Sequence, residues 1–332
     1  MGVLWIVLLF VVRYNSLFFM NSFFRHLAMA SACIIWGLMA PLAKDAMRTD
    51  FSGMDMVAFR VAGGALCFWL TSLVLTLSGR KQERVPLHYI GLFFLASLCS
   101  ITFNQGMFTI GVSMTSPVNA SIMTTTLPII SLILSAVFLH ERVSWQKIVG
   151  ICLALSGALM VILTSHTASA VGAVNPYRDA LGAAMCVLAQ CSFATYLVVF
   201  GKLIRKYPVV TCMKWMMLFA TLTIWPFALP HIVSLPWSTI AARSYWETGF
   251  VVFFGTYCAY ILMTWAQQVL RPTQVSIYNY FQPVVSCLAS VMMGLAVFGY
   301  LQAIAVLLVF SGVYLVTNTR TQKERVAGLR KL

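Results

Sequence analysis

The sequence predicts an all-α integral membrane protein in which ten transmembrane helices form two inverted five-helix repeats. Three observations lead to this fold: an apolar composition, breaks that separate ten apolar segments, and a set of matching residues 155 positions apart. Together they also predict a polar space between the two halves of the chain.

The composition requires lipid as the solvent for most of the chain. Of the 332 residues, 61% are hydrophobic and 9% are charged, whereas about a quarter of a soluble domain is charged. Residues 85–140 and 272–319 contain no Asp, Glu, Lys or Arg. These long runs favour helices, because barrel strands are short and alternate in polarity. The net charge of +14 does not indicate nucleic-acid binding, since the charges lie in short breaks between apolar runs.

Breaks divide the chain into segments of about 20 residues, the length that crosses a bilayer core. In the first half, the breaks lie around Asp50, Arg80–Arg84, Ser113–Ser116 and Glu141–Arg142. In the second half they lie around Lys202–Lys206, Ser234–Arg243, Gln268–Arg271 and the uncharged stretch GLAVFGYLQ. The expected helices therefore lie near 27–46, 54–78, 87–109, 116–139, 146–164, 179–200, 208–229, 245–267, 274–296 and 299–318.

Positive charge orients these helices, because cytoplasmic loops of membrane proteins are enriched in Lys and Arg. If residue 25 is cytoplasmic, 16 of the 22 Lys and Arg residues face the cytoplasm. They are Arg13, Arg25, Arg80, Lys81, Arg84, Arg142, Lys147, Lys202, Arg205, Lys206, Arg271, Arg320, Lys323, Arg325, Arg330 and Lys331. Both termini are therefore expected to be cytoplasmic. Without a large soluble domain or a eukaryotic targeting signal, the expected location is the inner (plasma) membrane of a bacterium.

The first 26 residues are expected to be a non-essential extension or the product of an over-long gene start. Residues 3–12 are apolar but too short to span a bilayer, and Arg13 follows them. An eleventh helix is disfavoured because it would place Arg13 in lipid. Met20 is an alternative start, and no small-residue cleavage site follows the apolar run convincingly.

The chain contains a repeat that becomes visible when it is shifted by 155 residues without gaps. The matching pairs are Pro117 with Pro272, Asn119 with Gln274, Ser121 with Ser276, Ile122 with Ile277, Pro128 with Pro283, and Ser156-Gly157 with Ser311-Gly312. Each copy has five expected helices, an odd number, so the second copy enters the membrane from the opposite side. Inverted repeats are a common plan of transporters, with the substrate site near the midplane between the copies.

Polar residues concentrate in two proline-bounded stretches, SPVNASIMTTTLP at 116–128 and RPTQVSIYNYFQP at 271–283. Polar groups at membrane depth are tolerated where they line a cavity. We therefore expect both stretches to face a central space. The alternative for each Ser or Thr is a hydrogen bond to its own helix or to a neighbouring helix.

A combination of motifs resembles a known family. A WG pair and a late lysine occur in ACIIWGLMAPLAKDAM (32–47), and an FR pair occurs in MVAFRVAGGAL (56–66). A Pro, Glu-Arg, Gly series runs through 111–162, and its proline part recurs in 271–294. Over about residues 27–318 the chain resembles the EamA-type members of the drug/metabolite transporter superfamily. One departure is Ala296, which lies opposite Glu141 where the family often has a second Gly-Glu pair.

The resemblance implies ten helices in two inverted repeats and the export or exchange of small metabolites, commonly amino acids and related compounds. It divides the chain into a first EamA repeat at 27–164 and a second at 179–318. Residues 165–178 are then an extracytoplasmic linker, and 319–332 are a basic cytoplasmic tail.

Two cations stand out as candidate binding or gating groups. Arg60 is expected two turns inside the second helix, where a guanidinium is costly unless it is paired or faces water. Lys44 lies near the outer end of the first helix, so the two residues are expected to form an anion-attracting mouth. The alternatives are snorkelling of Lys44 to the interface and a structural pairing of Arg60 with Asp45 or Asp55. For Lys214 in the seventh helix, snorkelling is the favoured interpretation.

The expected cavity helices also carry aromatic and amide side chains suited to an organic solute. Tyr278 and Gln282 are four residues apart and therefore share one helix face. Their counterparts, Met123 and Leu127, are apolar, so the cavity is expected to be asymmetric and to suit a small amphipathic metabolite. The predicted substrate-binding residues are Trp36, Arg60, Asn104, Gln105, Asn119, Gln190, Tyr260, Tyr278 and Gln282.

Gating is assigned to Lys44, Pro128, Glu141 and Pro283. A proline lacks an N–H and loosens the preceding helical turn, so Pro128 and Pro283 are expected to act as hinges. Glu141, beside Arg142, is expected to close the inner corner between the fourth and fifth helices. A surface ion pair of little energetic value is the alternative.

Other functions have less support in the sequence. The acids and histidines fall at span ends, so a buried proton relay is not expected, and diffusion, exchange or the membrane potential would drive transport. The nine cysteines show no CxxC pair, and no metal, cofactor or enzymatic site is expected. A passive channel is the main alternative, followed by an intramembrane enzyme. The expected partners are a small-molecule substrate and the lipid bilayer, with no nucleic acid, in a monomer or weak dimer.

Overall fold

The computed structural model describes residues 22–79, 83–114, 123–141, 143–165, 176–292 and 300–318. These residues form helices and connecting turns, with no strand among them. The first half contains α2 (Ser22–Thr49), α3 (Gly53–Leu77), α4 (Leu87–Ser97), η2 (Leu98–Thr102), α5 (Phe103–Met114), α7 (Leu127–Phe138) and α8 (Trp145–Ser165). The second half contains α9 (Pro176–Val199), α10 (Gly201–Lys206), α11 (Val209–Ser234), α12 (Ala242–Val252), η3 (Phe253–Cys258), α13 (Ala259–Gln267), α14 (Pro272–Ile277), η4 (Tyr278–Tyr280), α15 (Phe281–Met292) and α16 (Tyr300–Thr317).

The described helices confirm a multi-pass, all-α membrane fold. Five segments are long and apolar enough to cross a membrane: Gly53–Leu77, Leu87–Gly111, Ala180–Val199, Val209–Ser234 and Ala242–Gln267. Shorter apolar helices are Phe23–Met39, Leu127–Phe138, Trp145–Met160 and Ala303–Thr317. The ten-helix count is only partly visible, because residues 115–122 and 293–299, which belong to the expected fourth and ninth spans, lie outside the described part of the chain.

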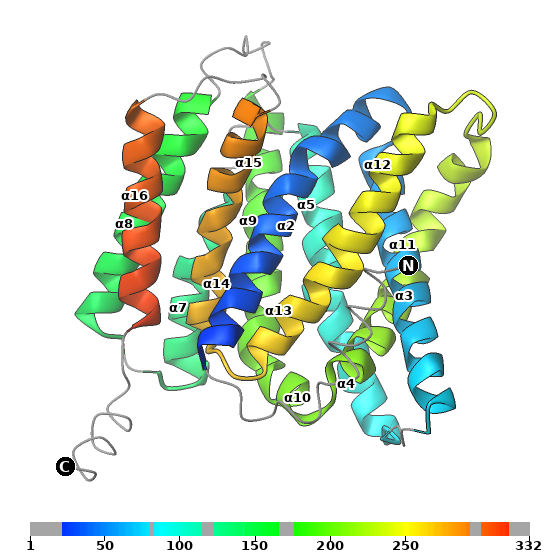
Figure 1. Ribbon diagram of the computed structural model, residues 1–332, viewed down its shortest axis with the longest axis horizontal. Coiled ribbons are helices and arrows are strands. Elements are labelled where there is room, and N and C mark those ends of the chain that lie inside the picture. The colour runs from blue at the N-terminus through cyan, green and yellow to red at the C-terminus, as the bar shows by residue number, and fades with distance from the viewer. Residues whose placement is uncertain are drawn as a thin grey trace.

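The helix packing follows the predicted inverted repeat. Helix α2 packs against α13 and α15, and α9 packs against α5 and α7. Shifting each member of the first set by 155 residues exchanges it with a member of the second. Two further pairs, α3 with α11 and α8 with α16, join equivalent helices of the two copies and stand at opposite sides of the bundle (Figure 1).

The pair α8 and α16 shows the symmetry at the level of single residues. A Cβ atom on Gly157 would lie 2.6 Å from the carbonyl oxygen of Ala305, and one on Gly312 would overlap the carbonyl oxygen of Gly150. Gly150 and Ala305 are equivalent positions in the two copies, as are Gly157 and Gly312. The two contacts are therefore equivalent contacts of one interface. Small residues let membrane helices approach this closely.

Two π-helical turns also occupy equivalent places. The turn η2 begins at Leu98 and η3 begins at Phe253, 155 residues later. A π-turn disturbs the regular ladder of helix hydrogen bonds, and it often marks a functional site. Carbonyl oxygens of both turns accept hydrogen bonds from the other copy. Ser192 Oγ donates to the Cys99 carbonyl oxygen at 2.8 Å, and Trp36 Nε1 donates to the Gly255 carbonyl oxygen at 2.8 Å.

The two proline-bounded stretches are broken helices. Pro128 lies in the first turn of α7, after a turn at Thr125 and Thr126, and Pro283 lies in the first turn of α15, after η4. Proline fits the first helical turn because that turn needs no N–H donor. Both prolines therefore restart a helix after an interruption.

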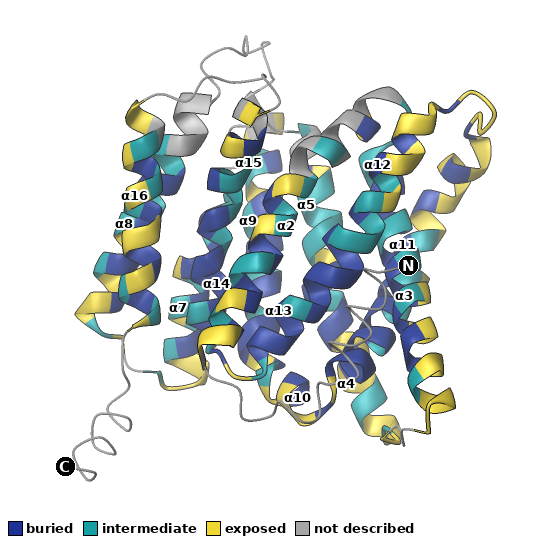
Figure 2. Cartoon of the chain, viewed as in Figure 1, coloured by how far each residue is buried: buried dark blue, intermediate teal, exposed yellow. Residues whose placement is uncertain are grey.

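The core lies between the two copies, and the outer faces meet lipid. Buried residues concentrate on the middle helices, notably α13, while exposed residues lie on outer faces (Figure 2). In the apolar window of the Ala242–Gln267 segment, 67% of the residues are buried, against at most 44% in the windows of the other four long segments. On α3, the outward side chains Leu66, Leu70 and Leu73 are each more than half exposed, as expected for contact with acyl chains.

Helix α2 begins at Ser22, within the segment that the sequence placed ahead of the first repeat. Arg25 is consequently part of the helix, and it is buried. Its guanidinium carbon lies 4.0 Å from the ring centroid of Trp265, and Nη1 donates to the Trp265 carbonyl oxygen at 2.5 Å. A cation–π contact and a hydrogen bond accommodate this charge between α2 and α13.

Candidate functional site

Arg60 lies two turns after the start of α3, and it is half-buried among neutral partners. Its Nε donates to Thr256 Oγ1 at 3.1 Å, and its Nη1 donates to Gln105 Oε1 at 3.4 Å. Of the carboxylates that the structure describes, none forms an ion pair with this guanidinium. The charge is therefore held in place without being neutralised by those groups.

Asp55, one of the two predicted counter-ions of Arg60, has other partners. Its Oδ2 accepts bonds from the backbone N–H and hydroxyl of Ser52, at 2.8 and 2.7 Å, in the cap of α3. The same oxygen lies 2.7 Å from Nδ1 of His231 on α11. Asp55 therefore joins α3 to α11. The prediction that Asp55 is the counter-ion of Arg60 is wrong. The side chain of Asp45, like that of Lys44, lies outside the described atoms.

The π-turn η3 orients the main partner of Arg60. The Thr256 hydroxyl donates to the carbonyl oxygen of Val251 at 3.2 Å, which leaves its oxygen lone pairs to accept from Arg60. Because a hydroxyl has one donor hydrogen and two acceptor positions, both contacts form together. The distortion of the eighth span thus has a direct consequence for the geometry around Arg60.

Two amide side chains extend this arrangement from α5 to the second copy. Gln105 Nε2 donates to Asn104 Oδ1 at 3.3 Å, and Asn104 Nδ2 donates to the Ala189 carbonyl oxygen on α9 at 2.8 Å. Gln190, also predicted as a site residue, is buried next to this anchor. The chain of bonds leads from Arg60 through both amides to α9.

An aromatic pair borders the same region. The rings of Trp36 and Tyr260 meet edge to face, with centroids 5.7 Å apart. Trp36 Nε1 donates to the carbonyl oxygen of Gly255, which precedes Thr256 in η3, so the pair lies beside the partner of Arg60. We call Trp36, Arg60, Asn104, Gln105, Thr256 and Tyr260 the central polar cluster, which combines one cation, neutral donors and an aromatic wall.

Tyr278 and Gln282 belong to η4 and α15, and both of these elements pack against α2. The hydroxyl of Tyr278 is 2.9 Å from Nδ1 of His26 on α2. Gln282 Nε2 donates to Asn279 Oδ1 at 2.7 Å. His26, Tyr278, Asn279 and Gln282 thus form a second polar group. None of its described hydrogen bonds reaches Arg60. Asn119 lies outside the described residues.

Glu141 forms a buried ionic contact between the copies. Its Oε1 lies 2.9 Å from Lys147 Nζ and 3.5 Å from Arg271 Nη1, and its Oε2 accepts a bond from Thr273 Oγ1 at 2.9 Å. The side chains of Glu141 and Lys147 are only 10% and 4% exposed, so this is not a surface ion pair. The contact joins the corner between α7 and α8 to the start of α14.

Comparison with known proteins assigns the family. The sequence model of the EamA-like transporter family matches residues 23–163 and 180–318, which is more than half of the chain. The chain belongs to the EamA-like transporter family. The match falls on the two halves that the residue pattern had separated.

Relatives of this EamA-like transporter include proteins that are named as transporters. An uncharacterized transporter of Archaeoglobus fulgidus is 26% identical over 80% of this chain and 88% of its own length. The uncharacterized transporter YdfC of Bacillus subtilis is 27% identical over 71% and 72% of the two chains. Protein WALLS ARE THIN 1 of Arabidopsis thaliana is 26% identical over 76% and 72%. Where these names state an activity, the activity is transport.

A solved crystal structure shares the fold. It superposes with a TM-score of 0.71 over 88% of this chain and 96% of that chain, at 16% sequence identity. Identity this low supports the architecture alone.

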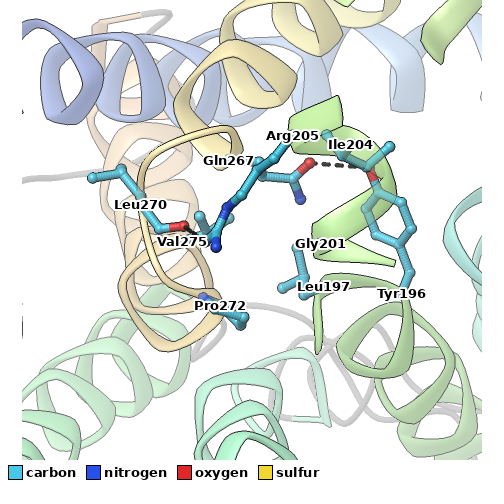
Figure 3. A pocket seen from close by; sticks show the side chains of 9 residues that line it. All are labelled: Tyr196, Leu197, Gly201, Ile204, Arg205, Gln267, Leu270, Pro272 and Val275. Atoms are coloured by element: carbon cyan, nitrogen blue, oxygen red, sulfur yellow. Dashed lines mark hydrogen bonds between the residues drawn. The ribbon is translucent and has the colours of Figure 1, made fainter. Parts of the chain in front are cut away.

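The EamA-like transporter has a further pocket close to α10 that the sequence did not indicate. It is small, since only about 10 Å³ admits a water-sized sphere, which is room for about one water molecule, and none of the predicted site residues lines it. Figure 3 shows its wall residues, which are Tyr196, Leu197, Gly201, Ile204, Arg205, Gln267, Leu270, Pro272 and Val275. Among the described residues, no group of three or more His, Cys, Asp or Glu side chains is placed to hold a metal.

Sequence reasoning missed Thr256, Arg205 and Gln267 and misjudged Lys214. Lys214 is buried rather than snorkelling: its Nζ donates to Ser72 Oγ at 3.0 Å and lies 5.2 Å from the Trp69 ring centroid. A single Thr in an apolar segment carries no signal that a π-turn will aim it at an arginine. Arg205 was counted only as one of the loop charges that set the orientation.

Proposed function

We propose that this EamA-like transporter exports a small amphipathic metabolite that carries a carboxylate, an amino acid or a related compound. The observation that supports this most strongly is Arg60, a half-buried guanidinium with two neutral partners and no ion pair among the described carboxylates. A charge at this depth is costly and generally marks a functional site. A planar guanidinium with unused N–H donors is the group best suited to a carboxylate.

The neighbours of Arg60 favour a substrate with an apolar body. Trp36 and Tyr260 supply an aromatic wall, and Asn104 and Gln105 supply neutral hydrogen-bonding groups. Ligand sites commonly combine an apolar lining with a few placed polar groups. A bare inorganic ion would leave the aromatic surface unused.

Transport would proceed by alternating access, with the repeats 27–164 and 179–318 rocking about the site. The buried contact of Glu141 with Lys147, Arg271 and Thr273 joins the copies near α10, and it would have to break when that end opens. Pro128 and Pro283 mark the interruptions about which the broken helices would bend, and Lys44 would attract anions at the opposite end. The positive charges predict that α10 faces the cytoplasm of a bacterial cell.

The test is to profile the medium of cells that express wild-type protein, Arg60→Gln or Arg60→Lys. Wild-type cells should accumulate one carboxylate compound outside, and Arg60→Gln should reduce its export at least roughly tenfold, the effect of losing one charged hydrogen bond. Arg60→Lys should retain part of the activity, because it keeps the charge without the planar fork.

Lys202→Gln is the matched control, since it removes an exposed positive charge on α10. It should export normally, and all variants should be present in the membrane at equal levels. Equal export by Arg60→Gln would remove Arg60 from the mechanism. Saturable flux with counter-transport of the identified compound would distinguish a carrier from a passive channel.

A further inference from the structure

The side-chain oxygens around Arg60 already accept hydrogen bonds from the protein. Thr256 Oγ1 accepts from Arg60 Nε at 3.1 Å, and Gln105 Oε1 accepts from Arg60 Nη1 at 3.4 Å. Asn104 Oδ1 accepts in turn from Gln105 Nε2 at 3.3 Å. Each of these oxygens therefore uses an acceptor position on a protein donor rather than on a ligand.

Two backbone carbonyl groups that the central polar cluster contacts are occupied in the same way. The Gly255 carbonyl oxygen in η3 accepts from Trp36 Nε1 at 2.8 Å. The Ala189 carbonyl oxygen on α9 accepts from Asn104 Nδ2 at 2.8 Å. Carbonyl oxygens that would otherwise be available to a positively charged group of a ligand thus have protein partners.

Donors, in contrast, remain in excess. A guanidinium has five N–H donors, and the two described hydrogen bonds of Arg60 use one at Nε and one at Nη1. Three donors on Nη1 and Nη2 therefore have no partner among the described residues. Gln105 Nε2 and Asn104 Nδ2 each have a second hydrogen without a described acceptor. The Tyr260 hydroxyl, which forms no described hydrogen bond, can donate or accept and leaves this balance unchanged.

The carboxylates that the structure describes do not compensate the charge of the cluster. All but Glu83 bond to residues outside it, and Glu83 is exposed in the turn before α4. The described carboxylates are Asp50, Asp55, Glu83, Glu141 and Glu247. An ammonium group at this site would therefore face a guanidinium and several amide donors, without a charged acceptor among the described residues.

We propose that the central polar cluster selects a carboxylate that lacks an ammonium group, such as an N-acylated amino acid, over a zwitterionic amino acid. This inference rests on the proposed function, because Arg60 holds the carboxylate in both. It narrows the substrate class: the second polar group is an acceptor, for example an amide carbonyl oxygen, which would receive the spare hydrogen of Gln105 or Asn104. An ammonium would bring three more N–H donors to a site whose acceptors are in use, and unpaired charge of this kind is an effective means of rejecting a ligand.

Counterflow in proteoliposomes tests this selection directly. The probes are L-phenylalanine, L-leucine and L-serine, each paired with its N-acetyl derivative, so that apolar and polar side chains are both covered. The full-length wild-type protein should transport at least one N-acetyl compound with a kcat/KM roughly tenfold to a hundredfold above that of its free amino acid, the effect of leaving a charged group without its hydrogen bonds. If no N-acetyl compound is transported better than its free partner, the proposal is overturned.

A single substitution should reduce this preference. Gln105→Glu still accepts from Arg60 Nη1, but it adds a negative charge that attracts an ammonium and competes with a carboxylate for the guanidinium. The ratio of N-acetyl to free amino acid transport should fall at least roughly tenfold. Gln146→Glu makes the same change at an exposed position of α8 and should keep the wild-type ratio. Because the ratio compares two substrates in one protein, the amount of folded protein does not affect it, and an unchanged ratio in Gln105→Glu would contradict the proposal.

The variant Arg60→Gln separates this proposal from the proposed function. Transport of an N-acetyl compound that is lost in Arg60→Gln supports both. Free amino acids transported as well as their N-acetyl derivatives, in a manner that depends on Arg60, would leave the proposed function standing and overturn the selection against ammonium. Transport of N-acetyl compounds that Arg60→Gln leaves intact would overturn both, since the carboxylate would then be held elsewhere.

Discussion

The Tyr280 hydroxyl donates a hydrogen bond to the backbone carbonyl oxygen of Thr125 at 2.9 Å, and the two residues are 155 positions apart. They are therefore the same position in the two copies of the repeat, so the bond crosses the axis that relates them. Tyr280 ends the 3₁₀ turn of one broken helix, and Thr125 lies in the turn that precedes α7. The two interruptions thus contact each other across the two copies.

Removing this bond should destabilise the protein modestly. Tyr280→Phe keeps the ring but loses a buried hydrogen bond, so we expect unfolding in detergent to become easier by about 1 kcal/mol. Differential scanning fluorimetry measures the change as a lower melting temperature. Tyr300→Phe is the control, because Tyr300 is 77% exposed and should show no shift. An unchanged melting temperature for Tyr280→Phe would mean that the broken helices do not depend on this contact.

The close approach of α8 and α16 should not tolerate a methyl group. In Gly312→Ala the new Cβ would overlap the backbone of Gly150 and Ala154, which cannot move aside like a flexible side chain. Overpacking of this kind costs about 1–3 kcal/mol, and the same fluorimetric assay should show a clear loss of stability. Gly91→Ala places a methyl group where no atom lies within 4 Å and should be neutral or slightly stabilising. Similar stability of both variants would contradict the described interface.

The π-turn at Thr256 should influence substrate affinity through Arg60. Thr256→Val keeps the side-chain shape but removes the acceptor of the Arg60 Nε hydrogen bond. Once the exported compound is known, KM in vesicles should rise roughly three- to tenfold with little change in kcat, because a neutral hydrogen bond that orients the guanidinium is lost. Thr195→Val is the matched control, since the Thr195 hydroxyl bonds to the carbonyl oxygen of its own helix. A normal KM would show that Thr256 does not position Arg60.

The repeat, and the presence of polar residues within its apolar segments, could be predicted from the sequence. The offset of 155 residues, found from Pro117, Pro272 and their neighbours, also relates the π-turns, the glycine contacts and the Tyr280–Thr125 bond. Arg60 could be selected because a charge in an apolar segment requires an explanation wherever its partner lies.

The partners of these residues could not be predicted from the sequence. Membrane helices associate through packing and hydrogen bonds rather than through a hydrophobic effect, so a polar residue indicates that a partner exists without indicating which one. Asp55 lies five residues from Arg60 yet bonds to His231 on another helix. Lys214 similarly finds Ser72 instead of the interface. The pocket with Arg205 and Gln267 forms only when α9 and α10 meet the segment that joins α13 to α14.

The most direct test of the account is to lock the two copies together near α10. Glu141 and Thr273, whose side chains are in contact across the copies, are replaced by cysteine and joined with a bifunctional methanethiosulfonate reagent. Transport of the identified compound in vesicles should fall in proportion to the crosslinked fraction and return after reduction, while the parent protein and each single-cysteine variant, treated in the same way, keep the activity that each had before treatment. Undiminished transport by the crosslinked protein would contradict alternating access through the separation of the two copies at this end.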